Sequence, residues 1–201
     1  MSKSKGGFTT LQTLIDAGVH PLAYRLMCLS AHYRSELEFS GENLLAALTR
    51  LKRLVIAAER FLAKAGPEPD EWTPGAAALA YLQRLDEAVA DDLNTPRALP
   101  VLDEVLGDKK LPAADRRPLL AAFDAVLGLD LLTLDRAALR VRPKDAALTA
   151  DDVEARLSER REARVARDFA RGDAIRDALA AAGVEVMDGD PLGWDWRPEL
   201  D

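Results

Sequence analysis

The stretch 42–65 constrains the fold most strongly, because its apolar residues recur every three or four positions. They are Leu44, Leu45, Leu48, Leu51, Leu54, Val55, Ala58 and Leu62. This period places them along one side of an α-helix, and Ser40 stands where an N-cap is expected. A long helix with one apolar side needs other helices to cover that side. The stretch therefore predicts a helical bundle.

Helical spacing continues through most of the chain, in which leucine and alanine are frequent and β-branched residues are few. Thr73-Pro74 and Thr95-Pro96 each have the pattern of an N-cap followed by the first helical residue. Further helices are expected over 8–17, 21–30, 74–90, 96–107, 117–127, 151–166 and 168–182. Residues 184–187 alternate like a strand, and turn residues lead to a second strand at 194–197. We predict a mainly α fold: an antiparallel helical bundle followed by a small α-plus-β-hairpin C-terminal unit.

Turn residues and caps suggest where the parts of the chain begin and end. Residues 1–35 form a loop with connecting helices, 36–128 the helical bundle, 129–148 a linker, and 149–201 a small separate domain. Thr149 opens this domain, with Asp152 three residues later in the pattern of a capping box. The organisation thus predicts two folded parts joined by an irregular segment.

Composition limits the functional classes. The chain is 48% hydrophobic and 30% charged, which is typical of globular proteins. It has neither an apolar run long enough to span a membrane nor a secretory signal, so no membrane partner is expected and the expected location is the cytoplasm. Cys28 is the single cysteine, which excludes an internal disulfide, and we expect it in the core. His20 and His32 lack companions at ligand spacing, so no metal site is expected.

The charge is unevenly distributed along a chain whose net charge is −7. Residues 1–64 are net basic, whereas 65–150 and 151–201 are net acidic. The last segment nevertheless carries seven arginines between Arg156 and Arg176. Such a local series can contact phosphates even in an acidic protein.

Five sequence segments carry a resemblance to a known family. The first, Met1-Ser2-Lys3-Ser4, matches the KMSKS loop of class I aminoacyl-tRNA synthetases apart from its first lysine. The others are Leu29–Ser35, Phe39–Leu44, Asp91–Leu99 and the stretch from Arg160 to Arg197. Together, and in this order, they resemble the C-terminal half of cysteinyl-tRNA synthetase over nearly the whole chain.

The resemblance implies an incomplete enzyme. The family's nucleotide-binding half, with its HIGH motif and bound zinc, precedes the lysine loop and is absent here. Lys3 matches the loop lysine that faces the ATP phosphates, with Ser2 and Ser4 shaping the loop, whereas Gly7 replaces the usual asparagine. ATP is therefore expected only together with the missing half, and this chain alone should not attach cysteine to tRNA.

The resemblance also implies that the C-terminal domain reads the anticodon of cysteine tRNA. The matching positions are Arg164, Phe169, Asp173 and Asp188. Arginine can contact a base or phosphate, an aromatic ring can stack, and carboxylates can accept from base amino groups. Two structural alternatives compete: Phe169 packs in the core, and Asp173 pairs with Arg176 on the same helix face.

Three functional hypotheses remain open at this stage. In the first hypothesis, the chain is the tRNA-binding half of a cysteine–tRNA ligase, and it is either encoded separately from the catalytic half or is a truncated form of the enzyme. Alternatively, it is a stand-alone paralogue that binds tRNA or protein without ligase activity. An enzyme that joins cysteine to an amino-sugar shares the loop and the bundle, but members of that type lack the anticodon domain.

Overall fold

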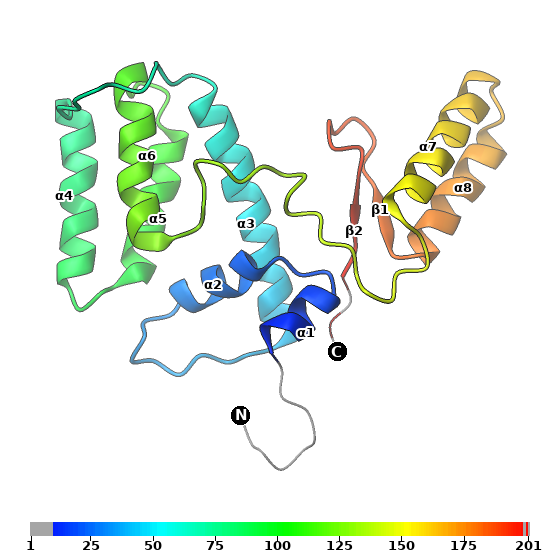
Figure 1. The fold of residues 1–201 in the computed structure, drawn as a ribbon, viewed down its shortest axis with the longest axis horizontal. Coiled ribbons are helices and arrows are strands. Elements are labelled where there is room, and N and C mark those ends of the chain that lie inside the picture. Colours follow the sequence, from blue (N-terminus) through cyan, green and yellow to red (C-terminus); the bar gives the residue numbers. More distant parts are fainter. Residues whose placement is uncertain (1–9, 199, 201) are drawn as a thin grey trace, which may run out of the picture. The chain divides into compact units, whose positions relative to one another are not determined.

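The computed structural model describes residues 10–198 and 200 (Figure 1). Within these residues the elements are α1 (Leu11–Asp16), α2 (Pro21–Leu29), α3 (Gly41–Leu62), α4 (Ala76–Ala90), α5 (Thr95–Gly107), α6 (Ala113–Leu127), α7 (Ala150–Val165), α8 (Phe169–Ala181), β1 (Val184–Val186) and β2 (Trp194–Trp196). The predicted mainly α fold with one small hairpin is confirmed. Residues 128–149 contain no helix or strand.

The chain divides into two compact units. One unit runs from Leu22 to Leu139, and the other combines the residues up to Pro21 with those from Arg140 onward. In the first unit α3 lies against α5 and α6, and α4 lies against the same two helices (Figure 1). The Ser40 hydroxyl accepts from the Asn43 N–H at 3.1 Å and caps α3 as expected. Most of the predicted apolar stripe is buried, namely Leu44, Leu48, Leu51, Leu54, Val55 and Ala58.

Two helices of this bundle do not begin where their Thr-Pro pairs predict: α4 begins later and α5 begins one residue earlier. α4 begins at Ala76 with Gly75 as its N-cap, not at Thr73-Pro74. The buried Asp115 carboxylate accepts from the Gly75 N–H and from the Trp72 indole, and so holds the chain outside the helix up to Gly75. α5 begins at Thr95, after an N-cap at Asn94.

The Thr95 hydroxyl is used elsewhere, which explains why it does not cap α5. It donates to the carbonyl of Leu29 at 2.8 Å, a residue distant in the sequence. The turn just before it is also unusual, since Asp92 and Leu93 both have positive φ angles, of 57° and 54°. The Asp92 carboxylate accepts from the Tyr33 hydroxyl at 2.6 Å, and Leu93 is 59% exposed.

α6 begins at Ala113, four residues before its predicted start, and ends at Leu127 with Gly128 as its C-cap, in agreement with the predicted end. Gly128 has a φ of 60°, the left-handed conformation common after a helix. Beside it, the Arg25 guanidinium donates to the carbonyl of Leu127 at 2.6 Å and satisfies one end group of the helix. Cys28, on α2, is half-buried, not in the core as expected.

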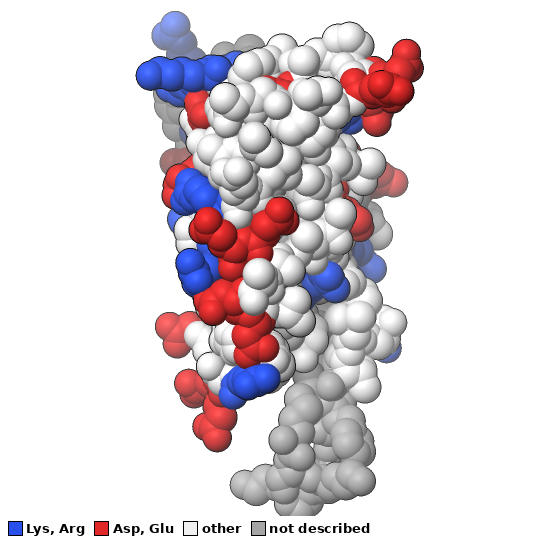
Figure 2. All heavy atoms as spheres, turned by 90° about the vertical axis from the view of Figure 1, so that its left-hand side faces the viewer, with Lys and Arg blue, Asp and Glu red and all other residues white. Residues whose placement is uncertain are grey.

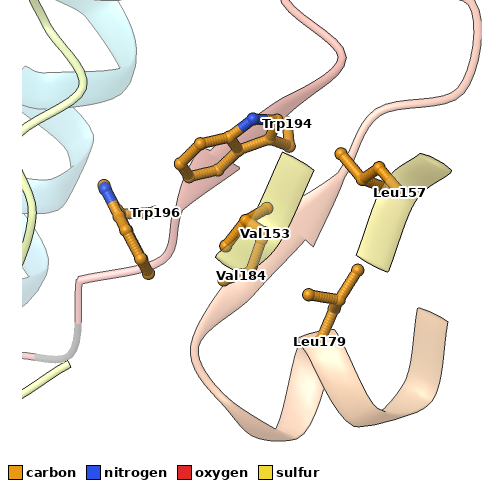
Figure 3. Close-up of a cluster of buried hydrophobic side chains, with 6 residues drawn as sticks. All are labelled: Val153, Leu157, Leu179, Val184, Trp194 and Trp196. Atoms are coloured by element: carbon orange, nitrogen blue, oxygen red, sulfur yellow. The ribbon is translucent and has the colours of Figure 1, made fainter. Parts of the chain in front are cut away.

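The second unit has its own core between α7, α8 and the hairpin (Figure 3). The strands are antiparallel, with Val184 opposite Trp196 and Val186 opposite Trp194. Trp194 and Trp196 meet edge to face at 5.1 Å, and the Arg140 guanidinium lies 3.9 Å from the Trp194 ring centre. Buried members of the core are Val153, Leu157, Leu179, Val184, Trp194 and Trp196. This small unit therefore has a hydrophobic core of its own that buries two tryptophans.

Candidate nucleic-acid interface

Three of the four predicted recognition residues, Arg164, Phe169 and Asp173, lie on the helix pair α7–α8. The fourth, Asp188, is hydrogen-bonded to α7. The Thr149 and Asp152 side chains form the predicted capping box at the start of α7. A tight turn follows α7, in which Arg167 has a φ of 60° and the Asp168 carboxylate caps α8 by accepting from the Arg171 N–H at 3.0 Å. The end of α7 therefore lies beside the start of α8.

Asp188 lies in the turn between β1 and β2 and is bound by Arg160 of α7. The two terminal nitrogens of Arg160 donate to the two carboxylate oxygens of Asp188, at 2.7 Å and 2.8 Å. The Arg160 side chain is 5% exposed, whereas that of Asp188 is 51% exposed. The hydrogen bonds from Arg160 lower the pKa of Asp188, and those to Asp188 raise the pKa of Arg160. Asp188 is therefore held as a carboxylate that still faces solvent.

Further charged side chains surround this pair. Arg164 lies 4.0 Å from Asp188, and Arg164 and Arg176 both contribute to the lowered pKa of that carboxyl. The negative charge of Asp173 in turn helps to raise the pKa of Arg160. We call these five residues the α7–α8 charge cluster: Arg160, Arg164, Asp173, Arg176 and Asp188. Three of the four predicted residues thus belong to one cluster.

The side chain of Arg164 crosses from α7 onto α8. A Cβ atom at Gly172 would lie 3.5 Å from the Arg164 Cγ, so the stem of Arg164 packs beside the residue that precedes Asp173. Gly172 itself is buried between the helices. The Arg164 side chain as a whole remains 47% exposed. Arg164 and Asp173 on the helix pair, and Asp188 in the hairpin turn, are thus all accessible to solvent.

Phe169, the fourth predicted residue, is the first residue of α8 and is 61% exposed. The alternative that Phe169 packs in the core is therefore wrong. Val165, at the end of α7, is 86% exposed. Both apolar side chains flank the turn that joins the helices. An exposed aromatic ring beside arginines is typical of surfaces that stack single-stranded bases.

The simple pairing of Asp173 with Arg176 is not what the structure contains. The Arg176 guanidinium instead forms an ion pair with Asp177, at 3.9 Å. Arg160 was not predicted as a site residue. A sequence signal for it existed, because Arg160 continues the apolar spacing of Val153 and Leu157 along α7, where a charge is expensive unless it is paired.

The face of the first unit that includes α4 suits a nucleic-acid backbone less well. Figure 2 shows the face that includes α4, where acidic side chains gather in the middle. Arg84 of α4 is paired with Glu104 through two hydrogen bonds, of 2.6 Å and 2.7 Å. This pairing neutralises one cation on a face where acidic side chains gather, which makes the face less favourable for phosphates.

Three further expectations concern the lysine loop, metal binding and membrane spans. Ser2, Lys3 and Ser4 lie outside the residues that the structure describes. Among the described residues, no three His, Cys, Asp or Glu side chains are arranged to hold a metal ion. No helix in that part of the chain has the length and apolar character to cross a membrane.

Comparison with known proteins identifies the relatives of the chain. No protein-family model matches it. It is 59% identical to the cysteine–tRNA ligase of Novosphingobium aromaticivorans over 98% of this chain and 40% of that relative. It is 53% identical to the cysteine–tRNA ligase of Zymomonas mobilis over 99% of this chain and 44% of the relative. A cysteine–tRNA ligase of Burkholderia lata is 43% identical over 94% of the chain.

Such identity over nearly the whole chain places it among the aminoacyl-tRNA synthetases, with the bundle and the charge cluster described above. Within that class, the chain belongs to the cysteinyl-tRNA synthetase family. It spans less than half the length of the two most similar of these relatives.

Proposed function

We propose that the chain is the C-terminal, tRNA-binding part of a cysteine–tRNA ligase and acts in the cytoplasm. The observation that carries the proposal is the α7–α8 charge cluster beside an exposed Phe169, in a chain whose relatives are named cysteine–tRNA ligases. In the proposed complex, the second unit binds the anticodon of cysteine tRNA.

Each predicted residue has a role that its surroundings support. Phe169 stacks on an anticodon base, since its ring is largely exposed. Arg164 binds a base edge or phosphate, and Asp173 accepts from a base amino group. Asp188 does the same despite its pair with Arg160, because each carboxylate oxygen has two lone pairs and half of the side chain is exposed.

We propose that the nucleotide site needed for catalysis belongs mainly to the rest of the ligase. In the proposal, the lysine loop with Lys3, Ser2 and Ser4 closes on ATP that the rest of the ligase binds, and the family's zinc belongs to that other part. An ammonium group near the phosphates stabilises the charge that develops on pyrophosphate. The chain is therefore proposed to be inactive alone.

Mixing the chain with a separately made remainder of the ligase tests the role of this loop. The mixture should restore cysteine-dependent ATP–pyrophosphate exchange, and Lys3→Ala should lower that exchange. The reason is that the substitution removes a cation from the reacting phosphates. Exchange that is restored and remains equal in Lys3→Ala would show that Lys3 has no such role.

Substitution of Phe169 tests the proposed tRNA surface. Phe169→Ala should weaken the binding of cysteine tRNA by about 1–3 kcal/mol, the range for one base stacked on an aromatic ring. Leu93→Ala is the matched control, since Leu93 is similarly exposed but lies in the other unit. Binding is measured by fluorescence anisotropy with labelled tRNA. Equal effects of the two substitutions would argue against stacking at Phe169.

A further inference from the structure

The contact between Arg160 and Asp188 joins a buried side chain of α7 to an exposed side chain of the hairpin turn. Arg160 is buried on the core side of α7, and its Nε has no hydrogen-bond partner among the described residues. Its two terminal nitrogens both donate to Asp188. The buried guanidinium thus directs its hydrogen bonds toward a single, half-exposed carboxylate at the surface.

The carboxylate would otherwise belong to a loop. Asp188 follows β1 in the turn closed by the hydrogen bond from Met187 N–H to the Gly193 carbonyl, and Gly189 in this turn has a φ of 81°. Residues in turns are usually more mobile than those in the helices and strands that the turns connect. Two parallel hydrogen bonds from a planar guanidinium fix both the place and the plane of the carboxylate. Arg160 therefore attaches Asp188 rigidly to α7.

A fixed carboxylate plane matters for reading a base. Since the two terminal nitrogens of Arg160 bind both carboxylate oxygens from one side, the remaining lone pairs face away from Arg160, and half of the Asp188 side chain is exposed to solvent. An amino group of a base must approach along those directions to form a good hydrogen bond. A carboxylate that could rotate would accept from donors in many positions and would discriminate less.

We infer that Arg160 is a positioning residue for anticodon recognition: it does not touch RNA, but it orients Asp188 so that only a correctly placed base amino group is accepted. This inference rests on the proposed function. It assigns part of the specificity for tRNA to a buried residue of α7.

Arg160→Lys in the full chain tests the inference, because it keeps the positive charge but removes the two-pronged donor. Arg161→Lys is the matched control, since it makes the same change at the adjacent, exposed residue. Dissociation constants are measured for cysteine tRNA and for the same tRNA with an altered anticodon. The ratio of the two constants reports discrimination, and circular dichroism reports folding.

We expect Arg160→Lys to lower the ratio at least about fivefold, the smaller end of what one good base contact contributes. The affinity for the altered tRNA should stay the same, and Arg161→Lys should keep the full ratio. A folded Arg160→Lys variant with an unchanged ratio would overturn the inference alone. A wild-type chain that does not distinguish the two tRNAs would overturn the proposed function and, with it, this inference.

A second measurement on the wild-type chain covers the case in which Arg160→Lys does not fold. Nitrogen-15 NMR of the arginine side chains resolves the terminal nitrogens of buried arginines. Cysteine tRNA should shift the signals of Arg160, because a base that binds Asp188 weakens its hydrogen bonds with Arg160. Identical spectra with the cognate and the altered tRNA would overturn the inference.

Discussion

Asp188 makes the second unit sensitive to acid. An unperturbed aspartate titrates near pH ~3.9, and the hydrogen bonds from Arg160 lower the pKa of Asp188 in the folded chain. The lowered pKa means that the pair stabilises the folded state fully above about pH 4. That stabilisation is lost as the pH falls through the lower, folded-state pKa.

Asp188→Asn should therefore reduce the free energy of unfolding at neutral pH, and the difference from wild type should shrink below about pH 4. At neutral pH the variant leaves the buried Arg160 without its charge partner. Urea unfolding followed by tryptophan fluorescence at several pH values measures this difference. Asp177→Asn, at an exposed position of α8, is the control. A difference that stays constant with pH would contradict the account.

At the same scale, the sequence suggested some of the proposed site residues and not others. Arg164, Phe169, Asp173 and Asp188 follow from family motifs, and the exposure of Phe169 agrees with its expected availability. Arg160 was missed because its importance depends on its burial against Asp188, a residue distant in the sequence. A position on the apolar side of a helix does not by itself reveal which partner neutralises its charge.

At the scale of single elements, some helix ends were predictable from the local sequence and others were not. Ser40, Thr149 and Gly128 act through neighbours a few residues away, so their roles were predictable. The starts of α4 and α5 were not, since Asp115 and the Leu29 carbonyl come from distant parts of the chain. Local pattern fixes a helix end only when no tertiary contact competes with it.

The end of α6 gives a testable prediction about such a local signal. Gly128→Ala should lower the free energy of unfolding by about 1–2 kcal/mol, because a residue with a side chain is strained at this positive φ. The new Cβ would also lie 2.7 Å from the Arg25 guanidinium. Chemical denaturation measures the change.

Gly107→Ala is the control for this substitution. Gly107 ends α5, and an added Cβ there meets no atom within 4 Å. Alanine should therefore stabilise the chain slightly, by about 0.4–1 kcal/mol, by restricting the unfolded state. A similar loss of stability in both variants would show that the strain at Gly128 is not the cause.

For the whole molecule, the net charge of −7 does not describe how charge is distributed over its elements. Acidic side chains gather on the face that includes α4 (Figure 2), whereas the arginines of the second unit lie on α7 and α8. The sequence predicted this uneven distribution. It did not predict that Arg84 is paired while Arg164 stays largely exposed, since both facts depend on packing.

The most direct test of the proposed function is the affinity of the purified chain for cysteine tRNA and for an anticodon-altered version, measured across a salt series. Salt must be varied because released counterions contribute strongly to any binding of nucleic acid. The account predicts that both affinities fall with salt while the preference for cysteine tRNA persists. Equally weak binding of both tRNAs at every salt concentration would contradict it.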